Sequence, residues 1–115
     1  MTMPGSLTDV HFVRLKTFDR TVRGLLSDDD ERDLEEDIAG NPKGAPVIAE
    51  TGGVRKIRAR IGQRGKRGGA RVLYLYVEDI ETVYLLWVFP KNVRENITKP
   101  EKKIIRGMVA RLKEE

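Results

Sequence analysis

The residues of this chain whose types and spacing suit chemistry are cations. From position 54 to position 71 there are eight Lys or Arg and no Asp or Glu. Guanidinium and ammonium groups clamp phosphate oxygens and stabilise the charge that develops when a phosphodiester is attacked. The pattern predicts a surface that binds or cleaves a polyanion, RNA being the best candidate, and the alternative is a generic solvated basic face. The eight cations are Arg55, Lys56, Arg58, Arg60, Arg64, Lys66, Arg67 and Arg71.

Alternation along the chain sorts these cations by face. Side chains of a strand repeat every two residues, so Lys56, Arg58 and Arg60 fall on one face and the apolar residues between them on the other. Arg71 opens the next apolar run, and Lys91 follows the run after that. If the three runs are neighbouring strands, these cations converge on one surface of a sheet.

Cleavage of RNA through its own 2′-OH needs a base, a stabiliser of the phosphorane and a proton for the 5′-oxygen. Arg cannot be the base because it stays protonated. Lys56 is the best available base, since repulsion from the neighbouring cations favours its neutral form. Lys91 or an Arg would serve the leaving group, and the residues alone do not choose between them.

Other chemistries find little support in the sequence. Cysteine is absent, and the single histidine, His11, lies in a strand-like segment where a structural role is commoner than catalysis. The acids of residues 28–37 sit at a helix start, where capping explains them. No metal-ligand spacing or Walker A motif is present, so we expect no metal and no small-molecule cofactor.

Length and charge indicate one small domain with a dipolar surface. A chain of 115 residues fits a single domain. Residues 1–50 carry 6 Lys/Arg against 11 Asp/Glu, a net −5, and residues 51–115 carry 16 against 7, a net +9. Such asymmetry favours steering of an anionic partner to one face. Because no signal peptide or bilayer-spanning run is recognised, we expect a cytoplasmic protein that does not bind membranes.

Hydrophobic periodicity predicts an α+β fold in the order β-α-α-β-β-β-α. Residues 1–8 are expected to be disordered or a remnant of expression, and residues 9–115 to form the domain. We predict a mainly antiparallel sheet with the helices packed on one face and the basic side chains on the other. The expected strands are 10–16, 54–61, 70–77 and 82–89, with a hairpin loop at 62–69, and the expected helices are 17–26, 27–40 and one that starts with a capping box at 98–101.

Two stretches resemble a known family. TGGVRKIRARIGQRGKRGGARVLYLYV and, after the last strand, FPKNVRENITKPEKK are similar to the RelE/HigB-type toxins of bacterial toxin–antitoxin modules, particularly the HigB-like branch. The resemblance covers about residues 10–113 and implies a small RelE-like sandwich. It also implies a toxin that inhibits translation by metal-independent, ribosome-dependent cleavage of mRNA, with a cognate antitoxin as its protein partner.

The resemblance assigns site residues by position. It implies catalytic roles for Lys56, Arg58, Arg71 and Lys91. Phe89-Pro90-Lys91-Asn92-Val93 stands where relatives often have Tyr-x-Lys-Asn/Ser-Glu, and the C-terminal tyrosine of some members has no counterpart. A non-catalytic binder of rRNA or tRNA and a gyrase-poisoning relative remain alternatives. The expected contacts to RNA or the ribosome are Arg55, Arg60, Arg64, Lys66, Arg67, Asn92 and Arg94.

Overall fold

A four-stranded mixed sheet forms the centre of the molecule. The computed structural model describes residues 10–62, 69–91 and 96–114. The order across the sheet is β1-β4-β3-β2, with β2, β3 and β4 antiparallel and β1 parallel to β4. The predicted antiparallel meander is confirmed. The strands are β1 His11–Arg14, β2 Arg55–Ala59, β3 Ala70–Val77 and β4 Thr82–Pro90, and a short helical turn η3 Glu78–Ile80 joins the last two.

Three helices surround this sheet, namely α1 Lys16–Val22, α2 Asp28–Gly40 and α3 Lys99–Glu114. Both predicted N-terminal signals are confirmed. The hydroxyl of Ser27 accepts from the backbone N–H of Asp30, and the carboxylate of Asp30 accepts from the N–H of Ser27. Thr98 and Glu101 form the same reciprocal pair at the start of α3. The first helix is shorter than predicted because Gly24 takes a left-handed conformation, φ +75°, which turns the chain after Val22.

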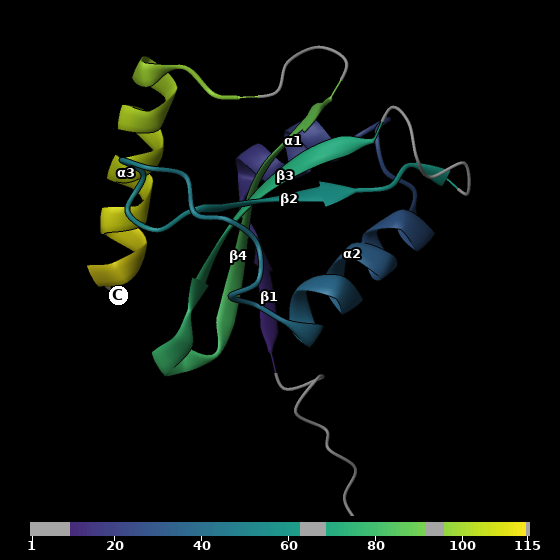
Figure 1. Ribbon diagram of the computed structural model, residues 1–115, viewed down its shortest axis with the longest axis horizontal. Helices are drawn as coiled ribbons and strands as arrows, with labels where there is room; N and C mark the ends of the chain where they lie inside the picture. The colour runs from purple at the N-terminus through teal and green to yellow at the C-terminus, as the bar shows by residue number, and fades with distance from the viewer. Residues whose placement is uncertain (1–9, 63–68, 92–95, 115) are drawn as a thin grey trace, which may run out of the picture.

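Helices cover both faces of the sheet, so the predicted arrangement with all helices on one face is wrong. One core packs α1 and α2 against one face through residues such as Phe18 and Ile38. A second core packs α3 against the other face through Ile105 and Val109. In Figure 1, α3 stands at the left of the sheet and α2 at the lower right.

The reason for two covered faces lies in β3. Val72 and Tyr74 point into the core of α1 and α2, while Leu73 and Leu75 point into the core of α3, and all four are at most 1 % exposed. A strand that is apolar on both sides must be covered on both sides. Lys56 and Arg58 of β2 share the side of Leu73 and so lie on the face of α3, whereas Arg55 pairs with Tyr74 and lies on the other face.

Candidate functional site

Two arginines stand directly opposite each other on β2 and β3. Arg58 pairs with Arg71 in the antiparallel register, and Lys56 pairs with Leu73 two residues along. All three cations therefore share the face that carries α3, as alternation predicted. Arg58 is exposed and Arg71 is half-buried. Like charges placed directly opposite destabilise a sheet, so this arrangement favours an anion at the surface of these strands.

The paired arginines line a cleft of about 450 Å³. One wall is the edge strand β2 together with Arg71. The other wall comes from the last turn of α2 and the loop after it. Ligand sites commonly have volumes of this size, and cations line this one on the sheet side. The lining residues are Asp37, Asn41, Gly44, Ala45, Pro46, Lys56, Ile57, Arg58 and Arg71.

The loop wall of the cleft is anchored by two side chains that point away from the cations. The Arg55 guanidinium donates to the carbonyl oxygens of Lys43 at 2.9 Å and Ala45 at 2.6 Å. The hydroxyl of Tyr74 donates to the carbonyl of Pro42 at 2.8 Å. Burial raises the pKa of Tyr74, and the charge of Arg55 offsets only part of that rise. Arg55, predicted as an RNA contact, is therefore placed to hold the loop.

Lys56 extends from β2 toward the residues that precede α3. Its ammonium donates to Oδ1 of Asn96 at 2.8 Å. Next to this bond is a small hollow of about 80 Å³, lined by Ile48, Lys56, Asn96, Ile97 and Lys102. Lys56 lines both this hollow and the larger cleft. It is thus the cation that joins the two.

Other predicted site residues either do not line the cleft or fall outside the described residues. The backbone N–H of Lys91 donates to the carbonyl of Gly69 at 3.0 Å, which continues the ladder between β3 and β4. Lys91 and the exposed Arg60 are not among the residues that line the cleft. His11 is at the opposite end of the sheet, where it pairs with Thr82. Arg64, Lys66, Arg67, Asn92 and Arg94 lie outside the described residues.

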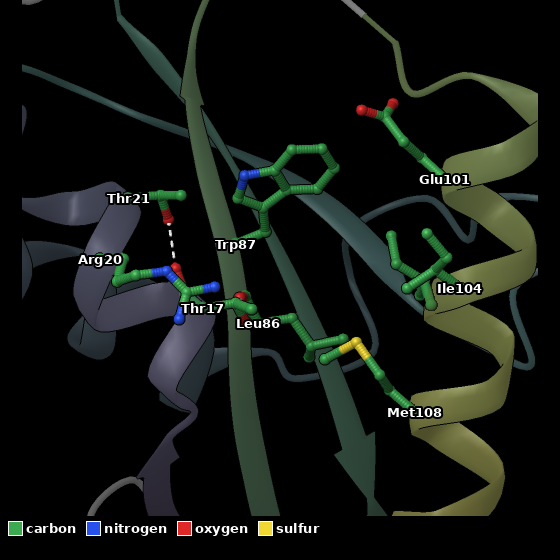
Figure 2. Close-up of a pocket in the computed structure, with 9 residues that line it drawn as sticks. Thr17, Arg20, Thr21, Leu86, Trp87, Glu101, Ile104 and Met108 are labelled. Carbon is green, nitrogen blue, oxygen red and sulfur yellow. Dashed lines mark hydrogen bonds between the residues drawn. The ribbon is translucent and has the colours of Figure 1, made fainter.

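A third hollow, between α1 and α3, has a different character. It encloses about 310 Å³ and is lined mainly by apolar groups over β4. Figure 2 shows Arg20 on α1 and Ile104 on α3 at opposite sides of Trp87. Arg20 and Glu101 are its only ionisable lining residues in the part of the chain that the structure describes. Its described lining has no cluster of cations like the one in the cleft of Arg58 and Arg71.

Neither a metal centre nor a membrane span is found among residues 10–62, 69–91 and 96–114. No group of three or more His, Cys, Asp or Glu in these ranges is placed to hold a metal ion. No helix in them is long and apolar enough to cross a bilayer.

Sequence reasoning missed four polar residues of these hollows, namely Asp37, Asn41, Asn96 and Lys102. Asp37 and Asn41 flank the stop signal of α2, and Asn96 and Lys102 flank the start of α3. Polar residues at helix ends are ordinarily explained by capping and solvation. Only their packing beside β2 distinguishes them.

Comparison with known families gives a match that spans nearly all of the chain. A family model described as the RelE toxin of the RelE/RelB toxin–antitoxin system matches residues 11–114. The matched range runs from the first residue of β1 to the last residue of α3.

Proposed function

The chain belongs to the RelE toxin family, and from this premise we propose that it inhibits translation by cutting mRNA on the ribosome. The cutting site would be the cleft of Lys56, Arg58 and Arg71. A cognate antitoxin is the protein partner that the family implies. Membership of the HigB-like branch stays a prediction.

The pairing of Arg58 with Arg71 carries this proposal. Two guanidiniums on adjacent strands present several N–H donors in planar forks, which match the oxygens of a phosphate. The rigid sheet fixes both strands before a substrate arrives. Donors that are already oriented toward developing charge need no reorganisation during the reaction.

The reaction consistent with this site is an internal transfer of the phosphate. The 2′-oxygen of one nucleotide attacks its adjacent phosphorus and loses its proton, and the bond from phosphorus to the 5′-oxygen breaks. The 5′-oxygen gains a proton, so the products are a 2′,3′-cyclic phosphate and a free 5′-hydroxyl. Arg58 and Arg71 would hold the non-bridging oxygens and stabilise the phosphorane.

Two groups beside the arginines could move protons. Lys56 lines the cleft next to Arg58, and its hydrogen bond to Asn96 holds it in place. Asp37 brings a carboxylate to the opposite wall. We propose Lys56 as the proton-transferring side chain, and the ribosome would supply much of the positioning of the substrate.

The test is cleavage of mRNA in a programmed ribosomal A site by the wild type, Arg58→Met and Arg71→Met. Met keeps the length of the stem and removes the donors. Loss of a transition-state donor lowers the rate by about 100-fold or more. Arg111→Met, which removes an exposed cation near the end of α3, should cut at the wild-type rate. Primer extension locates the cut in the mRNA, and detection of a 2′,3′-cyclic phosphate on the upstream product identifies the reaction.

Three results would reject parts of this assignment. Undiminished cutting by both variants would reject the cleft as the site. Arrest of translation without any cut mRNA would instead favour a non-catalytic binder of rRNA or tRNA. Double-strand breaks in DNA would favour a gyrase poison.

A further inference from the structure

We propose that Lys56, Asn96 and Lys102 form a second phosphate-binding site, beside the cleft of Arg58 and Arg71. It would take a backbone phosphate next to the one that is cleaved. The identity of the ligand as RNA rests on the proposed function, whereas the preference for an oxyanion follows from the side chains alone. Lys102, on the first turns of α3, becomes an RNA contact in addition to the cations of β2 and β3.

The position of Lys56 connects the two sites. It lines the large cleft together with Arg58 and Arg71, and it lines the small hollow together with Asn96 and Lys102. A chain of phosphates that enters the cleft therefore meets cations from β2, β3 and then α3. Such a track suits a polymer that repeats its negative charge at every nucleotide.

The small hollow offers hydrogen-bond donors. A lysine ammonium carries three donors and no acceptor. The bond from Lys56 engages the amide oxygen of Asn96, so the amide group contributes its N–H donors to the surroundings. Ile48 and Ile97 supply the apolar parts of the wall. The described lining residues offer donors and no carboxylate. Such a set suits an oxyanion, and it suits neither a cation nor a base edge that requires acceptors.

The nearest carboxylate of α3 is directed elsewhere. Glu101 precedes Lys102, but its carboxylate accepts from the backbone N–H of Thr98 at 2.8 Å, and the residue lines the apolar hollow beside Trp87. No Asp or Glu is among the residues that line the small hollow in the described part of the chain. The hollow of about 80 Å³ has room for a few water molecules and hence for one tetrahedral anion.

A second phosphate site would have a definite use in catalysis. Contacts to the phosphate backbone fix the register of a bound strand. With a neighbouring phosphate held at Lys102, the scissile phosphate would be fixed against Arg58 and Arg71. The free energy of binding at Lys102 would then offset the entropic cost of orienting the scissile phosphate. Loss of Lys102 should therefore weaken binding of the substrate more than it slows the chemical step.

The experiment compares Lys102→Met with Lys103→Met, a matched control that removes the next cation of α3, which is exposed. The first readout is binding of a single-stranded RNA with 2′-O-methyl groups, which cannot be cleaved, to the free protein. Fluorescence anisotropy at several salt concentrations should show about tenfold weaker binding for Lys102→Met. The slope of log affinity against log salt should fall by about 0.7, the value for one phosphate contact on a single strand.

The second readout is cleavage on the ribosome under single-turnover conditions. Lys102→Met should raise the concentration needed for half-maximal rate and leave the maximal rate near that of the wild type. Arg71→Met should lower the maximal rate. Lys102→Arg, which keeps the charge, should restore binding, and Asn96→Asp, which adds an anion to the hollow, should weaken it. Thermal melts establish that each variant is folded.

The outcomes separate this inference from the proposed function. Equal affinities and salt slopes for Lys102→Met and Lys103→Met would overturn the second site. So would an effect of Lys102→Met on binding of the antitoxin with none on RNA. If the wild type cut no mRNA but the salt slope still depended on Lys102, the phosphate site would stand and the nuclease assignment would fall.

Discussion

At the scale of single residues, Arg55 and Lys56 point to opposite faces of β2 although they are consecutive. The Arg55 guanidinium is bonded to the carbonyls of the loop that forms one wall of the cleft. Lys56 lines the cleft itself. A count of charges treats these residues alike. The pleat of the strand turns one toward the loop and the other into the cleft.

Asp30 is the residue whose titration should affect stability. Its carboxylate accepts from the backbone N–H of Ser27 at 3.0 Å and from that of Gly62 at 3.0 Å. Burial raises the pKa of Asp30, but these hydrogen bonds outweigh burial and leave the pKa below its ordinary value. A lowered pKa means that the folded state favours the ionised form. Its contribution to stability is present above the ordinary value, near 4, and is lost as the pH falls through the folded value.

Asp30→Asn should therefore lower the free energy of unfolding at pH 7. The difference from the wild type should shrink as the pH falls below about 4. Urea unfolding between pH 7 and pH 2 measures this. Asp29→Asn is the control, because Asp29 is 85 % exposed and pairs with the exposed Arg32 across the helix surface. If the difference in the free energy of unfolding between the wild type and Asp30→Asn stayed constant with pH, the ionised carboxylate of Asp30 would not be the source of the stability.

At the scale of elements, the turn between the cleft loop and β2 is fixed by a buried threonine. The hydroxyl of Thr51 donates to the carbonyl of Ile48 at 2.7 Å and accepts from the N–H of Val54 at 3.0 Å. Gly52 beside it has φ +84°, and a Cβ there would meet Cγ1 of Val109 at 3.0 Å. This turn therefore packs directly under α3 and sets the position where β2 begins.

Thr51→Val should destabilise the protein by about 1–3 kcal/mol. Valine keeps the shape of the threonine side chain but removes the hydroxyl that pairs with the carbonyl of Ile48 and the N–H of Val54. Thr51→Ser keeps the hydroxyl and loses only a methyl group, so it should cost less. Urea unfolding of both variants gives the comparison. A larger loss for Ser than for Val would show that packing, and not the hydrogen bonds, holds this turn.

At the scale of the whole molecule, the sheet has a core on each face. Ile105 is 4 % exposed in the core beneath α3, whereas its neighbour Ile104 is 66 % exposed. Ile105→Ala should cost about 2–5 kcal/mol, as large-to-small changes in cores do. Ile104→Ala should stay within about 0.5 kcal/mol of the wild type, as for most surface changes.

Thermal and urea unfolding measure both isoleucine variants. Leu34→Ala, in the core of α1 and α2, provides a reference for the opposite face. If Ile105→Ala left the free energy of unfolding nearly unchanged while Leu34→Ala lowered it strongly, α3 would contribute little to the stability of the fold.

The amino-acid sequence by itself determined the elements and much of the cation cluster. Alternation placed Lys56 and Arg58 on one face of β2, while a hydroxyl cap followed by acids marked the start of α2 and a capping box marked the start of α3. These features are local, because they depend on residues within a few positions of one another. The strand over 70–77 was predicted with the bounds that the structure shows.

Only the tertiary structure decided which residues share the cleft. Asp37 and Asn41 line the same cleft as the cations because α2 ends beside the edge strand, and Asn96 and Lys102 line the same hollow as Lys56 because α3 covers the second face. These contacts join residues far apart in the chain, and they depend on how amphipathic faces are buried against each other. Periodicity shows that a face is apolar. It does not show which partner covers that face, which is why the side of the sheet that α3 covers could not be predicted.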